Sequence, residues 1–380
     1  MPREEDFTSR LRSPATASRI GVWLGACFLV AFVTGVISHE AQAAHPVIDL
    51  PTRPVWGYRL TQGLHVVSGT AAVPLLLVKL WTVFPKLFAR PPRALRDLVL
   101  HALERGSIAL LVAAGIFQLA TGLANSAQWY PWEFSFRATH DAVGWIAAGA
   151  LLVHVAVKLP VIRSALAADI DATGLDRAGT APTSAISRRA LVRTSLLAAG
   201  VAVLATAGGT VPWLRRVSVL AVRSGSGPGG VPINKSARAA AVTVAALDPG
   251  YELRVAGPDG ERAFSRAGLE ELDQVSAQLP IACVEGWSAS GRWHGVRLRD
   301  LLDSVGAPRG RDVRITSLQA HGPYRVTTLP AAFADDPLTL LALGLDGEAL
   351  SIDHGYPCRL IAPDRPGVLQ TKWVSRVDVL

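Results

Sequence analysis

Long apolar runs alternate with short polar stretches over the first 213 residues of the chain. Five of these runs reach the roughly 20 residues that a helix needs to cross the hydrocarbon core of a bilayer. They lie at residues 20–38, 60–84, 107–125, 139–160 and 191–213. The pattern therefore predicts an all-α bundle of five transmembrane helices.

From residue 215 onward the pattern changes to short segments punctuated by frequent glycine and proline. Apolar and polar residues alternate, as in half-buried strands, at 251–255, 312–315 and 359–361, whereas helical spacing appears at 266–279 and 298–305. This mixture predicts an α+β domain. We accordingly expect a multi-domain chain in three parts: four membrane helices in 1–165, a cytoplasmic loop and the fifth helix in 166–214, and the α+β domain in 215–380.

The composition fits membrane segments, because 50% of the residues are hydrophobic and only 18% are charged, against about 25% charged in an average soluble domain. The formal net charge is +8, and it gathers before the first apolar run and in the second and fourth connections. The basic residues there are Arg3, Arg10, Arg12, Arg19, Lys86, Arg90, Arg93, Arg96, Arg105, Arg163, Arg177, Arg188, Arg189 and Arg193. By the positive-inside rule the N-terminus is cytoplasmic and the α+β domain lies outside. The charge thus indicates topology and contact with lipid, and not nucleic-acid binding.

Three histidines fall inside the predicted spans, where ionisable residues are costly and usually functional. His65 and His140 lie early in the second and fourth spans, which run in the same direction, so they form our preferred pair of axial ligands for one haem. His154 follows His140 by 154 − 140 = 14 residues, about 21 Å along a helix. That spacing leaves a second haem open, although Lys79 stands where a histidine partner for His154 would be expected and His101 is the only inner-side alternative. Simple pairing with polar groups between helices is the alternative for all three. Two other histidines are expected to be solvated in the first outer connection: His39 and His45.

The helices around these histidines resemble the cytochrome b-type membrane subunits that serve hydrogenases and formate dehydrogenases. The resemblance rests on His65-x3-Gly69 and on His140-x3-Gly144-Trp145, and it covers about residues 15–165, with Lys79 in place of one histidine of the pattern. It implies haem b as cofactor and the quinone pool as redox partner. Glycines beside the ligands would let a flat macrocycle approach the backbone, since small residues permit close packing between helices.

Cys283 carries the most distinctive chemistry of the α+β part. It follows a strand-like segment, and its surroundings read Ile-Ala-Cys-Val-Glu-Gly-Trp-Ser. A thiolate is a soft ligand that suits a thiophilic metal, although the spacing names no metal. A catalytic thiol with His294 as its base is the alternative. The other two cysteines, Cys27 and Cys358, are predicted to be buried thiols.

The same stretch closely resembles the molybdopterin-binding domain of the sulfite oxidase superfamily, nearest to the branch of periplasmic methionine sulfoxide reductase catalytic subunits. The similar motifs lie within about residues 230–380: Cys283-Val-Glu-x-Trp-Ser, Trp293-x-Gly, Asp346-Gly-Glu, His354-Gly-Tyr-Pro-Cys-Arg359, Pro363, Gly367 and Lys372-Trp373. The resemblance implies a molybdenum–molybdopterin cofactor with Cys283 as the protein ligand to molybdenum.

The pterin would also need groups that bind its phosphate and its ring. A phosphate favours arginine and lysine, and Arg359 and Lys372 occupy the basic positions of the family. We further expect His354 to hydrogen-bond the pterin, and Asn234 and Lys235 to line its pocket.

Ser187-Arg188-Arg189, just before the fifth run, looks like a twin-arginine export signal placed inside the chain. That pathway carries folded proteins, which fits a domain that receives its pterin in the cytoplasm. The twin-arginine translocase is therefore an expected partner. Ordinary positive flanking of a span would give the same residues and remains the alternative.

One departure from the family bears on the substrate. Sulfite oxidases follow their cysteine with a Gly-Asn-Arg-Arg type of sequence, whereas this chain has Glu285-Gly286-Trp287. A carboxylate near the metal would repel anions such as sulfite. We expect a two-electron oxygen-atom transfer outside the membrane, coupled through haem b to the quinone pool, with an S- or N-oxide as the small-molecule substrate. The alternative is a haem-b electron carrier with a non-catalytic outer binding domain.

Overall fold

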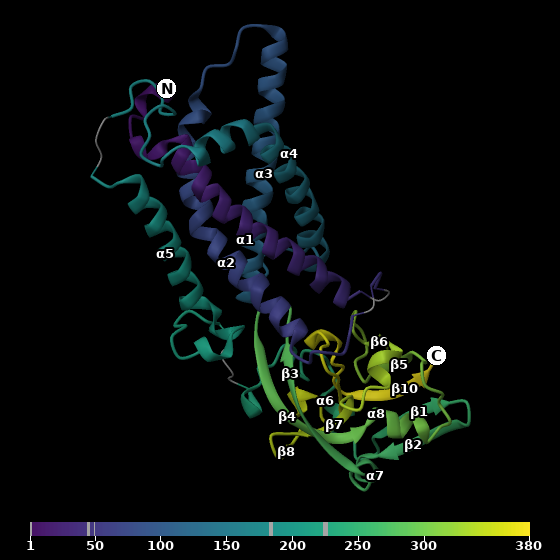
Figure 1. Ribbon diagram of the computed structural model, residues 1–380. Helices are drawn as coiled ribbons and strands as arrows, with labels where there is room; N and C mark the ends of the chain where they lie inside the picture. Colours follow the sequence, from purple (N-terminus) through teal and green to yellow (C-terminus); the bar gives the residue numbers. More distant parts are fainter. Residues whose placement is uncertain (1, 44–45, 49, 182–184, 223–226) are drawn as a thin grey trace. The chain divides into compact units, whose positions relative to one another are not determined.

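The computed structural model describes residues 2–43, 46–48, 50–181, 185–222 and 227–380 (Figure 1). The chain divides into two compact units. The first comprises Met1–Gly35 and Leu64–Ala207, and the second comprises Val36–Gly63 and Gly208–Leu380. The connection between the first two apolar runs thus belongs to the same unit as the C-terminal part. The boundaries expected at 165 and 214 stay predictions.

Within the described residues, five helices are long and apolar enough to cross a membrane, which confirms the five apolar helices predicted from the sequence. They are α1 (Pro14–Ala41), α2 (Gly57–Val83), α3 (Leu95–Ser126), α4 (Phe136–Ala167) and α5 (Arg188–Thr206) (Figure 1). α1, α3 and α4 extend beyond the apolar runs at both ends, because polar flanking residues continue the helical hydrogen bonding, whereas α2 extends only at its start. His39 lies in the last turn of α1 and is half-buried, whereas His45 lies outside the described residues.

The arginine pair before α5 is built into the first unit. The Arg188 side chain is fully buried and donates to both carboxylate oxygens of Asp176, at 2.5 and 2.6 Å. It also donates to the carbonyl of Arg10 at 2.9 Å. Arg189, in contrast, is exposed and pairs with surface carboxylates. Arg188 therefore has a structural role in the folded chain, and its reading as an export signal stays a prediction.

Two five-stranded sheets form the centre of the second unit. The first has the order β2-β1-β10-β5-β6, in which β1 and β10 are parallel and the other neighbours with recorded register are antiparallel. Its strands are β1 (Glu252–Gly257), β2 (Gly260–Ser265), β5 (Val313–Ser317), β6 (Val326–Leu329) and β10 (Val374–Val379). The strands expected near 251–255 and 312–315 are confirmed as β1 and β5.

The second sheet has the order β3-β4-β7-β8, and β9 also pairs with β7. Its strands are β3 (Gln274–Ala282), β4 (Ser288–Arg297), β7 (Leu340–Leu345), β8 (Glu348–Ala349) and β9 (Arg359–Ile361). Short α-helices lie between the strands in the described part of this unit: α6 (Thr243–Ala246), α7 (Arg266–Glu270), α8 (Leu298–Asp303) and α9 (Ala331–Ala334). The strand at 359–361 and the helix near 298–305 are thereby confirmed, and so is the α+β class.

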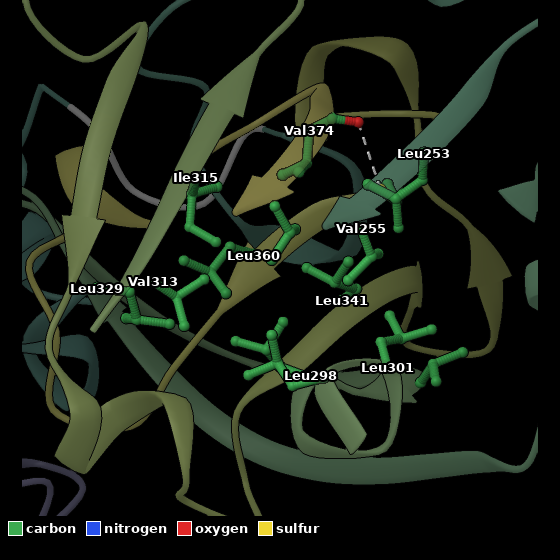
Figure 2. Close-up of a cluster of buried hydrophobic side chains, with 14 of the residues drawn as sticks. Leu253, Val255, Leu298, Leu301, Val313, Ile315, Leu329, Leu341, Leu360 and Val374 are labelled. Carbon is green, nitrogen blue, oxygen red and sulfur yellow. Dashed lines mark hydrogen bonds between the residues drawn. The ribbon is translucent and has the colours of Figure 1, made fainter. Parts of the chain in front are cut away.

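The largest buried cluster lies where both sheets meet α8. Leu253 and Ile315 from the first sheet pack with Leu341 and Leu360 from the second, and Leu298 of α8 closes the cluster. Figure 2 shows these side chains pointing toward one another. Each is fully buried, and burial of such a side chain stabilises the fold by roughly 1.5–3 kcal/mol. This core holds the two sheets in one domain.

One sequence prediction is wrong. The helical pattern at 266–279 is a helix only as far as Glu270, and residues from Gln274 onward form β3. Within this strand the exposed Gln274, Ser276 and Gln278 alternate with inward-facing Ala277 and Leu279. That period of two marks a strand, and the preceding short helix masked it when the whole stretch was taken as one helix.

Candidate functional site

Cys283 lies in the short loop, residues 283–287, that joins β3 to β4. The loop is closed by its own backbone, because the Cys283 amide donates to the Trp287 carbonyl at 2.9 Å and the Gly286 amide donates to the Cys283 carbonyl at 3.1 Å. Gly286 has a φ of 76°, a left-handed conformation that glycine adopts without strain. Cys283 and Trp287 are both buried. The thiol predicted at a strand end is thus presented by a rigid, buried turn.

Side-chain contacts brace the same loop. The Thr210 hydroxyl donates to the Gly286 carbonyl. The Trp287 indole N–H donates to the Glu285 carboxylate at 3.0 Å. Glu285 is therefore held beside the cysteine, and its charge acts on Lys372 across the site.

Arg359 is a buried cation with carbonyl partners. Its Nη1 donates to the His354 carbonyl at 3.0 Å and its Nη2 donates to the Gln370 carbonyl at 3.2 Å. The guanidinium carbon lies 5.1 Å from the centre of the Trp293 ring. Within the described residues its Nε atom is buried without a hydrogen-bond partner, and no carboxylate forms an ion pair with it. Burial lowers the pKa of Arg359 to about 9.

Lys372 is a second buried cation. Its Nζ donates to the carbonyls of Lys235 at 2.9 Å and of Asp353 at 2.8 Å. Burial lowers the pKa of the Lys372 amine to about 7, Arg359 lowers it further, and Asp353 raises it. In the part of the chain that the structure describes, no carboxylate lies within ion-pair distance of Lys372. A positive charge here is consequently costly unless an anion joins it.

The two cations and Cys283 belong to one site. Gly355 has a φ of 115°, and a Cβ atom on it would lie 2.9 Å from the Arg359 Cβ and 3.2 Å from the Lys372 Cβ. Glycine at this position therefore lets the two basic residues pack against the same turn. Cys283 in turn lies close enough to Lys372 to raise the pKa of its amine.

His354 and Asn234 lie close to the two buried cations, since Arg359 donates to the His354 carbonyl and Lys372 donates to the carbonyl of Lys235, the neighbour of Asn234. The His354 ring is buried, with Nε2 at 2.9 Å from the Val231 carbonyl and Nδ1 at 3.0 Å from the Ser351 hydroxyl. Burial lowers the pKa of His354 to about 4, so the ring is neutral at pH 7. The Asn234 carboxamide oxygen accepts from the Lys235 amide at 2.9 Å. Both ring nitrogens of His354 thus lie at hydrogen-bond distance from other groups of the protein. The predicted contacts of His354 and Asn234 with a pterin stay predictions.

This donor set fits a molybdopterin. A buried thiol at the end of β3 offers sulfur to a thiophilic metal. Arg359 and Lys372 offer an anion two charges that lack carboxylate counter-ions among the described residues, and the orphaned Nε of Arg359 adds an unused donor. Buried unpaired charges destabilise a fold, so a phosphate between them would remove a cost. Cys283 would hold the metal, and the two cations would hold the phosphate.

Lys372 should make the stability of the cofactor-free protein depend on pH. Its pKa falls from an ordinary 10.5 to about 7 on folding, so between these values the unfolded chain binds more protons and the stability rises with pH. The slope is at most about 1.4 kcal/mol per pH unit. The useful window is pH 7–9, because burial raises the pKa of Cys358 from 9.0 to about 11, and the opposite contribution of this thiol offsets that of Lys372 above pH 9.

The test is thermal unfolding of the full chain from a host without molybdopterin synthesis. The unfolding temperature of the cofactor-free wild type should rise from pH 7 to pH 9. A Lys372→Met variant should show a flat profile over the same range. Equal rises in both proteins would assign the pH dependence to other groups.

Arg365 is a further buried cation of the same domain, and it was not predicted from the sequence. Its Nη2 donates to the Thr328 carbonyl at 2.8 Å and its Nε donates to the Leu369 carbonyl at 3.3 Å. Burial lowers the pKa of Arg365 to about 10. The signal that could have found it is an arginine inside a stretch of otherwise buried residues, 358–374. Its contacts tie β6 to the turn Gly367–Leu369.

In the first unit, His65 of α2 and His140 of α4 face one another. Their ring centres are 6.3 Å apart and their planes are inclined at 68°. Nδ1 of His65 lies 2.8 Å from the Ala31 carbonyl, and Nδ1 of His140 lies 3.0 Å from the Thr121 hydroxyl. A histidine whose Nδ1–H donates to a carbonyl keeps the Nε2 lone pair for a metal. Two imidazoles on opposite sides of one ion, with bonds of about 2.0 Å as for zinc, would have ring centres roughly 6 Å apart.

Gly69 near His65 and Gly144 near His140 have different surroundings. A Cβ on Gly69 would meet no described atom within 4 Å, so the surface of α2 is open at this position. A Cβ on Gly144 would lie 2.9 Å from Nε2 of Gln118, which donates to the His140 carbonyl at 2.9 Å. Gly144 therefore makes room for Gln118, and the expectation that it admits a macrocycle is wrong for this position.

His154 has charged neighbours in place of a histidine partner. It lies half-buried in α4, within electrostatic range of Lys79 and Lys158. The Lys79 amine donates to the Ala17 carbonyl at 2.8 Å, and Lys158 forms an ion pair with Glu104. Lys79, which stands where a histidine partner was expected, is thus near His154 and is bonded to the backbone. The role of His154 stays a prediction.

Comparison with known proteins supports the C-terminal domain most strongly. The family described as "Oxidoreductase molybdopterin binding domain" matches residues 240–380. The chain is 31% identical over 159 residues to the mitochondrial sulfite oxidase of Drosophila melanogaster, which covers 34% of this chain and 27% of that protein. Cys283, His354, Arg359 and Lys372 lie inside the matched domain, whereas Asn234 precedes it.

Another relative is the "Putative protein-methionine-sulfoxide reductase subunit YedZ1" of Azospira oryzae, 34% identical over 130 residues that cover 34% of this chain and 48% of that protein. Among solved structures, the sulfane dehydrogenase SoxCD of Paracoccus pantotrophus matches with a TM-score of 0.31 and 24% identity, over 34% of this chain and 38% of that chain. The chain thus spans about half or less of the length of these relatives.

Proposed function

We propose that this chain, whose C-terminal part is a molybdopterin-binding oxidoreductase domain homologous to sulfite oxidases, reduces a small S- or N-oxide on the outer face of a membrane. The observation that carries the proposal is the pairing of the buried Cys283 loop with two buried cations, Arg359 and Lys372. When bound, the molybdenum cofactor supplies two-electron oxygen-atom transfer, and the protein supplies position and exclusion of water.

Reduction of an oxide balances with a quinol as the electron donor. The oxide takes up two electrons and two protons and leaves as the sulfide or amine plus water. The quinol gives up two electrons and two protons and becomes the quinone. Glu285 favours a neutral oxide over sulfite, because a carboxylate held beside Cys283 repels an anion. The name of the YedZ1 relative, a sulfoxide reductase subunit, points to the same class of substrate.

Haem b is the proposed carrier of single electrons between quinol and the molybdenum site. The facing rings of His65 and His140 support one bis-histidine haem. The helix that carries His65 also carries Tyr58, which belongs to the C-terminal unit. A shared helix is a physical reason to expect that both redox centres work in one protein.

The proposed orientation rests on the basic residues that flank alternate ends of the apolar helices. It puts the N-terminus in the cytoplasm and the catalytic domain outside, with Ser187-Arg188-Arg189 as a signal for the twin-arginine translocase. A reporter enzyme that is active only outside the cytoplasm, fused after Leu380, should therefore be active. An inactive reporter would reverse the orientation.

The proposed reaction is tested on the full chain purified in detergent. We expect about one molybdenum and at least one haem b per chain, by mass spectrometry and by reduced-minus-oxidised spectra. Dimethyl sulfoxide or trimethylamine N-oxide should be reduced when a reduced viologen or a quinol supplies the electrons. Oxidation of sulfite without reduction of any oxide would overturn the proposed direction, and absence of molybdenum would overturn the proposed enzyme.

A further inference from the structure

The start of α2 is fixed to the molybdopterin domain by one carboxylate. Asp364 accepts a hydrogen bond from the backbone amide of Tyr58 at 2.5 Å, whereas the Gly57 amide donates to the Pro54 carbonyl at 2.9 Å. The Tyr58 amide belongs to the first turn of the helix, which has no partner for it within the helix itself. A Cβ on Gly57 would lie 2.9 Å from both carboxylate oxygens, so glycine is what allows Asp364 to come so close.

Two other contacts hold the same segment in the C-terminal unit. Arg53 donates to both carboxylate oxygens of Asp336, at 2.7 and 3.0 Å, and Asp336 is buried. Val55 packs against the buried cluster that contains Cys283 and Trp287. The connection between the first two apolar helices is consequently part of the wall around the Cys283 loop.

Tyr58 is a buried side chain at the end of this connection. It is only 5% exposed, whereas its neighbour Trp56, at 52%, faces outward as expected for an interfacial aromatic residue. The Tyr58 hydroxyl lies 3.1 Å from the Ser38 hydroxyl and accepts from the Gln62 carboxamide at 2.9 Å. Its oxygen lies within electrostatic range of Cys283.

The chemistry of this group differs from that of the opposite side of the site. Arg359 and Lys372 are charged and suit a phosphate, whereas the hydroxyl and carboxamide groups around Tyr58 are neutral donors and acceptors. A neutral S- or N-oxide presents a single strongly dipolar oxygen that accepts hydrogen bonds. Such an oxygen can accept the Tyr58 hydroxyl proton in place of the Ser38 hydroxyl, whereas a substrate without an acceptor gains no hydrogen bond there.

We propose that Tyr58 determines substrate specificity by donating a hydrogen bond to the oxide oxygen of the substrate at the Cys283 site, and that Asp364 positions Tyr58 by holding the first turn of α2. This inference rests on the proposed oxide reductase function. It assigns a residue from the membrane-helix half of the sequence to the molybdenum site, 283 − 58 = 225 residues before the cysteine.

The test compares Tyr58→Phe with a matched control in the full-chain enzyme. The control is Tyr251→Phe, since Tyr251 is equally buried in the same unit but its hydroxyl is bonded to the Val374 carbonyl at 2.5 Å and to the Cys358 thiol. Tyr58→Phe should raise KM for dimethyl sulfoxide by about twofold to tenfold, the factor for one neutral hydrogen bond, with kcat changed less. The control should leave both constants unchanged.

A spectroscopic readout separates contact with the site from general loosening. The electron paramagnetic resonance spectrum of pentavalent molybdenum should change in Tyr58→Phe and should be unaltered in Tyr251→Phe. A change in KM without any spectral change, or with the same spectral change in the control, would overturn the assignment of Tyr58 to the site.

A third measurement does not need the reaction. In cofactor-free protein, Asp364→Ala should free the start of α2 and increase the alkylation rate of Cys283 severalfold, measured peptide by peptide with buried Cys358 as the internal reference. If the wild type reduces no oxide, the proposed function fails, and the alkylation rates still decide whether this segment covers Cys283. Unchanged alkylation of Cys283 would overturn the positioning role of Asp364.

Discussion

Replacing Cys283 with serine should abolish oxygen-atom transfer while leaving the fold intact. Serine has the same shape and can keep the backbone hydrogen bonds of the loop, in which the Cys283 amide and carbonyl both take part. Its hydroxyl, however, is a hard donor that stays protonated at neutral pH, whereas the metal needs a soft thiolate. Loss of an outer-shell partner already costs roughly 10–100-fold in activity, so loss of the metal ligand itself should cost more than about 100-fold.

The prediction is checked by activity, metal content and sulfur ligation in the same preparations. Molybdenum would be measured by mass spectrometry and the number of sulfur ligands by X-ray absorption, where Cys283→Ser should show one sulfur fewer. Cys358→Ser is the matched control, because Cys358 is a buried thiol of the same unit that packs in the other cluster, against Tyr251. Full activity of Cys283→Ser with unchanged sulfur ligation would remove Cys283 from the metal site.

The membrane helices were predictable because a single physical requirement fixes them. A helix in lipid must be apolar over about 20 residues. Each of these apolar runs is contiguous in the sequence, so it can be recognised without knowledge of the fold. The ends were less predictable, since α3 begins at Leu95 and continues through charged residues before the apolar run starts near 107. Helical hydrogen bonding tolerates polar side chains, so the apolar run marks only the part of the helix that needs lipid.

The site was predictable only in part, and the reason is the sequence distance between its members. Cys283 could be placed at a strand end from its neighbours alone. Its closeness to Lys372 depends on a glycine turn at Gly355 and on sheet pairing, which no local pattern encodes. No local pattern around Tyr58 predicts that its side chain is buried in the C-terminal unit. Burial against a segment from the other end of the chain is a tertiary property, and it overrides the local pattern.

Gly144 shows within the apolar helices, too, that local sequence does not reveal a tertiary neighbour. Gly69 and Gly144 stand at the same offset from their histidines, so the sequence treats them alike. The structure separates them, because the space next to Gly144 is taken by Gln118 from the neighbouring helix α3. Spacing along one helix predicts which face a residue occupies, but the partner on that face comes from another helix.

Replacing His65 or His140 with alanine should remove haem b and disconnect the enzyme from quinol. The two rings face each other with both Nδ1 atoms held by the Ala31 carbonyl and the Thr121 hydroxyl. A haem held by two axial imidazoles loses one of its two protein bonds in either variant. We therefore expect at least about a tenfold loss of haem affinity in each, which is the lower end of the cost of losing even an outer-shell partner.

The measurement combines haem content with two electron donors. Each alanine variant should lose the haem b difference spectrum and quinol-driven reduction, yet keep its molybdenum and its activity with a reduced viologen, which can deliver electrons directly to the outer domain. His154→Ala decides between one haem and two. With one haem it should leave the spectrum unchanged, and with two it should remove about half of it, since His154 would then serve a separate site. Full haem content in both His65→Ala and His140→Ala would show that the facing rings are a structural pair, and the electrons would have to come from a separate carrier protein.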